Sequence, residues 1–330
     1  HRIGQRGHQH AIVRGVFLDL ASVDNGDLDR SSLAASLPRW DWHAGTPAEE
    51  VPARILGAEI VVANKVPLDR RALGAGGALR LVAVAATGTN NVDLAAASES
   101  GITVCNIRDY CNEAVAQHAI TLMLNLLTGQ PWYWNRVRRG EWSAAPHFAL
   151  HDRPIREARG LALGVIGYGS LGRAVAGKAR ALGMQVLVAE QKGRPPRPGR
   201  LPFTEVLRQA DVVTVHCPLS DATRKLLGRE QLRAMKPTAL LINTARGGIV
   251  DEQALADSLR AGEIAGAGVD TLSEEPPPPG HPLLAADIPN LLLTPHNAWA
   301  SRPARQAALD QLAAVIGAFL AGAPINVVSP

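Results

Sequence analysis

The chain has 330 residues, 46% of them hydrophobic and 19% charged, which is the balance of a globular protein with room for two domains. Its formal net charge is +4, and the basic residues are scattered along the chain. The composition therefore does not indicate nucleic-acid binding and instead suits a small anionic ligand. The three cysteines, Cys105, Cys111 and Cys217, lack metal-ligand or C-x-x-C spacing, which predicts free thiols in a reducing compartment, the cytoplasm, and no metal site.

The chain begins with a polar, basic stretch, HRIGQRGHQH, which has no apolar core that could serve as a signal peptide. We expect residues 1–12 to form a disordered tail or to be a remnant of cloning. No apolar stretch approaches 18 uninterrupted residues, so we expect no membrane span.

From Val13 onward, short apolar runs alternate with segments of helical composition. Such alternation predicts a small doubly wound α/β unit with a parallel sheet. Loops at 64–67 and 87–91 leave the carboxyl ends of its strands, where open sheets of this kind bind ligands. The glycine-rich stretch 74–77 is interpreted as a loop. The expected strands are 16–18, 60–63, 81–85 and 102–104, and the helical segments are 47–56 and 92–100.

A helix is predicted over 112–127, where apolar residues recur at helical spacing. His118 on this helix is either a functional ligand or base, or a packed residue with one hydrogen bond, and we favour the packed residue. The segment after the helix is rich in aromatic residues without clear periodicity. It predicts an anchor against a second subunit, with a patch that holds down a long loop as the alternative. The aromatic residues are Trp132, Tyr133, Trp134, Trp142 and Phe148.

A glycine-rich turn links two predicted strands in the middle of the chain. The apolar run 161–166 ends at Gly167, and Gly167, Gly169 and Gly172 have G-x-G-x-x-G spacing. A helical pattern follows, and a second strand is expected at 185–189. In this context the first glycine permits the tight turn, the second lets main-chain N–H groups approach a pyrophosphate, and the third lets the helix pack on the strand. The pattern predicts a dinucleotide site, with Ser170 and Leu171 at the helix N-terminus facing the phosphates.

Glu190 stands about 20 residues beyond the glycines, where an acid accepts hydrogen bonds from an adenosine ribose. A carboxylate there repels a 2′-phosphate and favours NAD. Lys192, Arg194 and Arg197 follow closely and could reach such a phosphate, so NADP remains the alternative cofactor.

Four further strands are expected at 212–216, 239–243, 265–269 and 291–294, and each is followed at once by polar residues. Because carboxyl ends of parallel strands share one edge of a sheet, these residues should line one crevice. The amphipathic segment 302–320 predicts a helix that returns to cover the first unit. We therefore expect a discontinuous domain of 13–107 and 299–330, and a second domain of 108–298.

Three residues at these strand ends could carry a reaction. The guanidinium of Arg246 can hold a carboxylate bidentately, although a surface arginine is the alternative interpretation. The imidazole of His296 can exchange a proton with a hydroxyl or carbonyl oxygen. Glu275 could orient that imidazole and favour its protonated form.

The motifs GVIGYGSLG, NTARGGIVDE, DTLSEEPPPPGHPLL and TPHNAWAS together resemble the D-isomer-specific 2-hydroxyacid dehydrogenase family. The segments FLDLASVDNGDLD, VANKVPLD, AATGTNNVD and YCNEAVAQHAITLML are similar to its glycerate dehydrogenase, or hydroxypyruvate reductase, branch. The resemblance runs from about Val13 to the last residue. It implies a Rossmann NAD-binding domain, a smaller flavodoxin-like substrate domain and a homodimer. Gln117 departs from the glutamate of many relatives.

The resemblance also implies roles for single residues. Arg246 matches the arginine that binds the substrate carboxylate and carbonyl, Glu275 the glutamate that pairs with the histidine, and His296 the general acid and base. Asp270 matches the aspartate that holds the nicotinamide carboxamide. The other expected cofactor contacts are Cys217, Pro218, Thr223, Thr244, Ala245 and Ala298, and the expected substrate contacts besides Arg246 are Lys65, Gly88 and Asn90.

The predicted activity is hydride transfer between NAD(H) and a small 2-oxo acid, with hydroxypyruvate and D-glycerate as the leading pair and glyoxylate as a further substrate. Glu275 argues against formate oxidation, because formate dehydrogenases of the superfamily carry a glutamine there. The alternative function is an NAD(H)-sensing, corepressor-like scaffold that signals through a partner surface.

Overall fold

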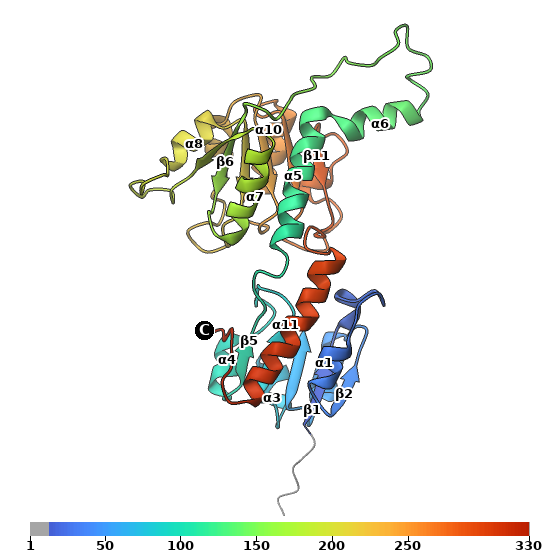
Figure 1. Cartoon of the computed structure of the whole chain (residues 1–330), viewed down its shortest axis with the longest axis vertical. Helices are drawn as coiled ribbons and strands as arrows, with labels where there is room; N and C mark the ends of the chain where they lie inside the picture. Colours follow the sequence, from blue (N-terminus) through green and yellow to red (C-terminus); the bar gives the residue numbers. More distant parts are fainter. Residues whose placement is uncertain (1–12, 330) are drawn as a thin grey trace, which may run out of the picture. The chain divides into compact units, whose positions relative to one another are not determined.

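The computed structural model describes residues 13–329, and the tail expected at 1–12 lies outside them. The chain divides into two compact units (Figure 1). Of the described residues, the first unit combines 13–111 with 300–329, and the second comprises Asn112–Trp299. The sequence placed these divisions at 107/108 and 298/299.

The first unit is built on a five-stranded parallel sheet with the order β2-β1-β3-β4-β5. This is the flavodoxin-like order, which confirms the predicted α/β class. β2 was not predicted, because its residues RWDW are only half-buried and lack an apolar run. The strands are β1 (Arg14–Phe17), β2 (Arg39–Trp42), β3 (Ile60–Ala63), β4 (Leu81–Val84) and β5 (Thr103–Cys105).

Helices cover both faces of this sheet because its strands are apolar on both sides. Val61 and Val82 face the helices α2, α3 and α4, whereas Ile60 and Leu81 face α1 and α11. Helix α3 includes Gly74, so the loop expected at 74–77 begins later than predicted. The helices are α1 (Ser31–Ala35), α2 (Val51–Ile55), α3 (Arg70–Ala75), α4 (Leu94–Glu99) and α11 (Arg302–Leu320), with short 3-10 turns η1 (Leu20–Ser22) and η2 (Ala48–Glu50).

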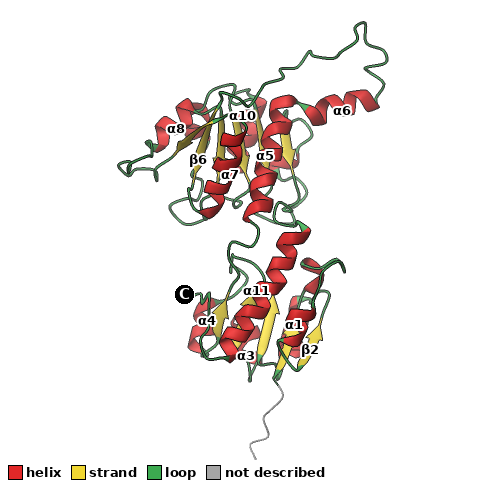
Figure 2. Cartoon of the chain, viewed as in Figure 1, coloured by secondary structure: helices red, strands yellow, loops and turns green. Residues whose placement is uncertain are grey.

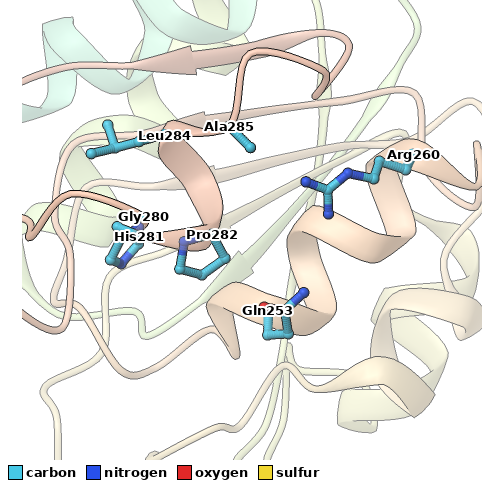
Figure 3. Close-up of a pocket in the computed structure, with 7 residues that line it drawn as sticks. All are labelled: Gln253, Arg260, Gly280, His281, Pro282, Leu284 and Ala285. Atoms are coloured by element: carbon cyan, nitrogen blue, oxygen red, sulfur yellow. The ribbon is translucent and has the colours of Figure 1, made fainter.

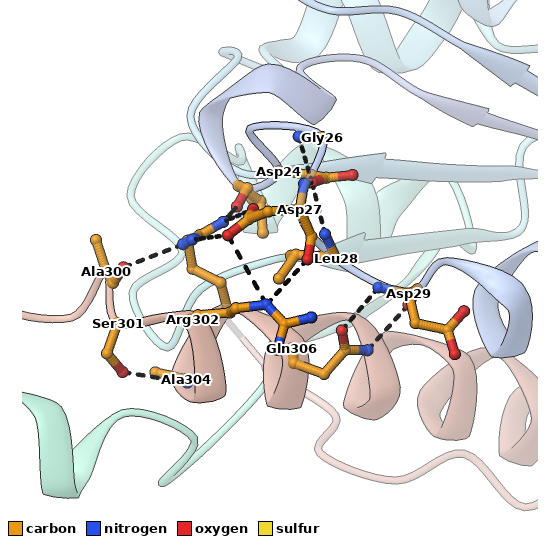
Figure 4. Close-up of polar contacts among 12 residues, drawn as sticks. Asp24, Gly26, Asp27, Leu28, Asp29, Ala300, Ser301, Arg302, Ala304 and Gln306 are labelled. Atoms are coloured by element: carbon orange, nitrogen blue, oxygen red, sulfur yellow. Dashed lines mark hydrogen bonds and ion pairs between the residues drawn. The ribbon is translucent and has the colours of Figure 1, made fainter.

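The C-terminal helix α11 lies across the first sheet (Figures 1 and 2). Its buried face supplies Leu309, Leu312, Val315 and Ile316 to the core. An ion pair also fixes the start of the helix: both ends of the Arg305 guanidinium donate to the Asp27 carboxylate, at 2.8 Å each. The side chain of the next residue, Gln306, hydrogen-bonds to the main chain of Asp29 (Figure 4). Residues near the two ends of the chain are thereby joined in one core.

The second unit is built on a six-stranded parallel sheet with the order β11-β10-β9-β8-β6-β7. A single parallel bridge joins Ala189 to Leu201 outside β7, where the Rossmann order 3-2-1-4-5-6 has its third strand. The direction of winding reverses between β6 and β8. The strands are β6 (Ala162–Ile166), β7 (Gln185–Val188), β8 (Val212–Val215), β9 (Leu240–Asn243), β10 (Gly266–Val269) and β11 (Leu291–Leu293).

Adjacent residues of β8 and β9 point into different cores, as the period of a strand requires. Val212 and Leu240 pack against α5 and α7, whereas Val213 and Leu241 pack against α8, α9 and α10. The helices are α5 (Asn112–Thr128), α7 (Ser170–Ala181), α8 (Phe203–Gln209), α9 (Arg229–Ala234) and α10 (Glu252–Arg260), with a 3-10 turn η3 (Pro282–Leu284).

The aromatic segment begins with a helix that sequence periodicity did not reveal, α6 (Gln130–Arg138). The helix and the loop after it extend away from the second sheet (Figure 1). Arg136 and Arg153 stack on the Trp132 ring, while Trp134 is 60% exposed and Phe148 is 93% exposed. Among residues 13–329, no helix is both long and apolar enough to cross a membrane.

Candidate active site

The turn from β6 into α7 is possible only with glycine at two of its three glycine positions. A Cβ on Gly167, whose φ is +90°, would lie 2.5 Å from the main-chain nitrogen of Cys217. A Cβ on Gly172 would lie 2.1 Å from the carbonyl oxygen of Gly167. Gly169 differs, because a Cβ there would meet no atom within 4 Å. The turn therefore packs β6 tightly against α7 and the end of β8. It leaves open space on the side of Gly169 where a Cβ atom would lie.

This turn fits the pyrophosphate of a dinucleotide. Helix α7 has 12 residues, and no side chain caps its N-terminus, where Gly169 and Ser170 are exposed. The N–H groups of a first helical turn have no partner within the helix and attract an anion.

The hydroxyls of Thr244 and Thr271, just beyond β9 and β10, are buried and have no hydrogen-bond partner among the described residues. Buried hydroxyls of this kind are typical of a place where a ligand supplies the partner.

The residues that follow β8 were expected to line the cofactor. Burial raises the pKa of the Cys217 thiol to about 11, so the thiol stays protonated and is not a base. The Thr223 hydroxyl donates to the Pro218 carbonyl oxygen at 2.7 Å and accepts from the Ser220 N–H at 2.7 Å. Thr223 thus closes this turn. Ala245 and Ala298, expected beside the cofactor as well, are both buried.

Glu190 lies two residues beyond the last residue of β7, close to the strand end where it was expected, but its carboxylate is already engaged. The Arg197 side chain donates to both carboxylate oxygens at 2.7 Å, and the N–H groups of Gln191 and Arg197 donate at 2.9 and 3.2 Å. The sequence suggested Arg197 as a possible phosphate contact and gave no sign of this pairing.

His296 and Glu275 are brought together by the loops after β11 and β10. Nδ1 of the imidazole lies 2.6 Å from Oε2 of Glu275, and Oε1 of Glu275 accepts the Leu272 N–H at 2.9 Å. Since Nδ1 faces the carboxylate, Nε2 is the nitrogen that can exchange a proton with another molecule. The backbone of His296 has a φ of +50°, a conformation that residues other than glycine rarely adopt.

Arg246 follows β9 in a turn that packs closely against the loop of Glu275, and Gly247 allows this close packing. A Cβ on Gly247 would lie 1.9 Å from the carbonyl carbon of Leu272, so only glycine allows this approach. The turn is closed by the Asn243 side chain, which accepts the Ala245 N–H and donates to the Arg246 carbonyl oxygen at 3.1 Å each. The guanidinium of Arg246 donates to the Ala245 carbonyl oxygen at 2.7 Å, and the residue is exposed.

Asp270 organises the loop that carries His296. Its buried carboxylate accepts hydrogen bonds from the Asn297 and Ala298 N–H groups, at 3.1 and 3.0 Å, and from the Thr294 hydroxyl at 2.5 Å. Because Thr294 donates its proton to Asp270, its oxygen accepts from Nε2 of His118, 3.0 Å away. His118 is therefore a hydrogen-bonded support of this loop. Sequence reasoning did not find the Thr294 link, because the two partners of the threonine are 24 and 176 residues away.

The loop of Glu275 is also supported by the carboxylate of Glu252. Glu252, in the first turn of α10, accepts hydrogen bonds from the Ser273 N–H and hydroxyl at 2.6 and 2.7 Å. Its carboxylate also lies 2.8 Å from Nε2 of His281, which is buried beside η3. A hollow of about 300 Å³ lies here between α10 and η3 (Figure 3), and no predicted site residue lines it. Its arginine, Arg260, is paired with Asp287.

The residues expected to contact the substrate in the first unit lie on two linked loops. The N–H groups of Asn64, Lys65 and Val66 donate to the buried carboxylate of Asp19, at 2.7 to 3.2 Å. Gly88 and Asn90 lie in the loop after β4, and the Asn91 side chain joins this loop to the Val66 carbonyl oxygen at 3.0 Å. Asp19 was not identified from sequence, because no motif marks a single aspartate at a strand end.

A guanidinium, an imidazole and a glycine turn at the strand ends of one Rossmann sheet define a dinucleotide-linked oxidoreductase. Residues 120–298 match the family model described as D-isomer specific 2-hydroxyacid dehydrogenase, NAD binding domain. The chain belongs to this family, and the family predicted from sequence is confirmed.

The relatives support the same class over nearly the whole chain. A glycerate dehydrogenase of Methylorubrum extorquens is 46% identical over 308 residues, which are 91% of this chain and 97% of the relative. A hydroxypyruvate reductase of Blautia hydrogenotrophica is 37% identical over 95% of this chain and 99% of its own. Among solved structures, an NADPH-dependent glyoxylate/hydroxypyruvate reductase of Sinorhizobium meliloti has a TM-score of 0.79 at 28% identity, covering 96% of this chain and 97% of its own.

Proposed function

We propose that the chain interconverts a small 2-oxo acid and the corresponding D-2-hydroxy acid, with hydroxypyruvate and D-glycerate as the preferred pair and glyoxylate as a further substrate. The observation that carries the proposal is the 2.6 Å contact between Nδ1 of His296 and Glu275, at the edge of the sheet that also bears the glycine turn. The names of the similar glycerate dehydrogenase and hydroxypyruvate reductase support the choice of substrate.

Each of the three residues has a separate task in the reduction. NADH, when bound, supplies the hydride that reaches the carbonyl carbon of the 2-oxo acid. Protonated His296 gives the proton on Nε2 to the carbonyl oxygen, which becomes the hydroxyl. Glu275 stabilises the imidazolium before the transfer, because a carboxylate at hydrogen-bond distance favours the charged ring. Arg246 holds the substrate carboxylate with its planar guanidinium.

The proposed cofactor site runs along the strand ends of the second unit. The pyrophosphate would be held by the glycine turn, which comprises Gly167, Gly169 and Gly172 with Ser170 and Leu171. The adenosine ribose would lie near Glu190. Asp270 would face the nicotinamide carboxamide. NAD(H) is the expected cofactor. The remaining proposed contacts are Cys217, Pro218, Thr223, Thr244, Ala245 and Ala298.

The first unit is proposed to contribute the substrate loops. Gly88 and Asn90 would supply main-chain N–H groups to the acid. Lys65 would contact the acid through its side chain, because its main-chain N–H donates to Asp19. The support from Asp19 and Asn91 favours loops of fixed shape. A homodimer through α6 and a cytoplasmic location complete the proposal. The exposed side chains of Trp134 on α6 and of Trp142 and Phe148 on the loop after it support the first. The three cysteines, none of which forms a disulfide in the described part of the chain, support the second.

Replacement of His296 by glutamine tests the central role. His296→Gln should still bind NADH, measured by fluorescence titration, while its turnover of hydroxypyruvate should fall by at least ~100-fold. Glu274→Gln is the matched control, because Glu274 is exposed next to Glu275 and should change turnover little. Unchanged turnover in His296→Gln would sink the assignment.

A panel of 2-oxo acids separates the enzyme from the NAD(H)-sensing scaffold. NADH oxidation should be fastest with hydroxypyruvate and measurable with glyoxylate. Failure with hydroxypyruvate, glyoxylate and phenylpyruvate alike would favour the scaffold, which none of the relatives named above supports.

A further inference from the structure

The carboxylate of Glu190 has no acceptor site left for a ribose. Each carboxylate oxygen has about two acceptor sites, and each receives two donors from Gln191 and Arg197. Glu190 is 2% exposed, whereas the side chain of Arg197 is 59% exposed. A ribose hydroxyl can therefore reach Glu190 only by displacing the arginine.

The pairing also changes the charge at this strand end. Arg197 holds the pKa of the Glu190 carboxyl well below its usual range, chiefly through the side-chain hydrogen bonds. Both side chains are therefore charged, and the positive charge of Arg197 cancels the negative charge of Glu190. Arg200 lies 3.8 Å from the same carboxylate. Lys192 and Arg194 are exposed on the turn between Glu190 and Arg197. One carboxylate thus has two cations within 4 Å, and two more cations lie on the same turn, so the turn as a whole attracts an anion.

An acid at the end of the second strand selects NAD by accepting ribose hydrogen bonds and by repelling the 2′-phosphate of NADP. Both effects are reduced here. The guanidinium has five N–H groups, and its two hydrogen bonds to Glu190 leave three for another acceptor on its exposed side. Arginine binds a phosphate strongly, by charge-assisted hydrogen bonds that are often bidentate.

We propose, on the basis of the proposed dinucleotide function, that Arg197 is a specificity-determining residue that makes this site accept NADPH as well as NADH. It neutralises Glu190 and presents its remaining N–H groups to the 2′-phosphate. The acid of the motif, which in isolation favours NAD, serves here as the support that orients the arginine.

Binding of adenosine 2′,5′-bisphosphate and of 5′-AMP, measured by calorimetry, tests this without any turnover. The two ligands differ only in the 2′-phosphate. The wild-type protein should bind the bisphosphate more tightly, and added salt should reduce the difference because the contact is ionic. In Arg197→Gln the preference for the bisphosphate should fall about 10-fold or more, while 5′-AMP binds as well or better because Glu190 becomes available.

Two further variants keep the test independent of folding. Arg197→Lys retains the charge without the fork and should keep part of the preference. Arg208→Gln, at an exposed arginine of α8 outside the turn, should keep nearly all of it. Retained 5′-AMP binding in each variant shows that the site is folded.

Two results would overturn the inference alone: a wild-type protein that binds the bisphosphate no better than 5′-AMP, or an Arg197→Gln variant that weakens both ligands equally. Failure of the wild-type protein to bind NADH, NADPH and 5′-AMP would instead overturn the proposed function and the inference with it.

Discussion

Gly169 and Gly172 belong to one motif but meet opposite constraints. A Cβ at Gly169 has open space in the protein, and its φ of −84° suits any residue, whereas a Cβ at Gly172 would strike the Gly167 carbonyl oxygen at 2.1 Å. Gly169→Ala should therefore leave the melting temperature unchanged and weaken NADH binding, because the methyl group occupies the space proposed for the pyrophosphate. Gly172→Ala should lower the melting temperature itself.

Thermal unfolding and NADH titration of both variants check this contrast. Loss of melting temperature in Gly169→Ala, or undiminished NADH affinity in that variant, would contradict the assignment of the open space to the cofactor.

Thr294 is a positioning residue for the His296 loop, acting through Asp270. Thr294→Val removes one hydrogen bond from a buried carboxylate and one from His118. Loss of such a partner costs about 1–3 kcal/mol, so kcat/KM for hydroxypyruvate should fall roughly 10-fold, mainly in kcat. Thr294→Ser retains the hydroxyl and should recover most of the loss. Equal activities of the valine and serine variants would show that the hydroxyl has no such role.

The sequence was informative for residues whose chemistry is visible in a motif, and much less so for their supports. Arg246, Glu275 and His296 were predicted because strand ends and polar residues coincide, and the structure pairs the last two. Asp19 and Thr294 were missed because their partners lie far away along the chain. Arg197 was noticed for its charge, but whether it faces Glu190 depends on how the turn 191–200 folds back.

Among the elements, α11 depends on a salt bridge that is sensitive to acid. Hydrogen bonds from Arg305 lower the pKa of Asp27 from 3.8 to about 2. A carboxyl group whose pKa is lowered in the folded state adds stability above its unfolded pKa and loses that contribution as the pH falls through the folded value. The contribution of this pair should therefore be complete above about pH 4 and disappear toward pH 2.

The variant Asp27→Asn tests this window by thermal unfolding at several pH values. Its melting temperature should lie below that of the wild type at neutral pH, and the difference should shrink between pH 4 and pH 2. Asp221→Asn, an exposed change in the other unit, is the control and should show no such trend. A difference that is constant with pH would exclude the ion pair as its cause.

Elements with a strong apolar pattern were predicted well. The bounds of β3 and α11 match the expected residues, and the six strands of the second unit lie within one residue of the expected bounds at each end. The elements that were not predicted are β2, which is half-buried, and several helices of five to nine residues: α1, α3, α8, α9 and α10. Helix α6 carries so many aromatic residues on several sides that no apolar face was visible before the structure.

At the scale of the whole molecule, the exposed aromatic surface of α6 and its loop predicts self-association. Phe148→Glu, at a side chain that is 93% exposed, should shift the protein toward the monomer in analytical ultracentrifugation. Leu56→Glu introduces the same charge at another exposed apolar residue, 64% exposed in the first unit, and should leave the mass unchanged. A wild-type protein that sediments as a monomer at all concentrations would disprove the proposed dimer.

The C-terminal helix has a consequence for how the protein is made. The strands β1 to β5 are synthesised first, but Leu309, Leu312 and Ile316, which cover one face of their sheet, are synthesised after the whole of Asn112–Trp299. Domains fold as units while the chain emerges, so the second unit can complete its core earlier. The first unit must meanwhile keep an apolar sheet face uncovered. The nascent chain is thus most prone to aggregation, and most dependent on chaperones, while its middle is being translated.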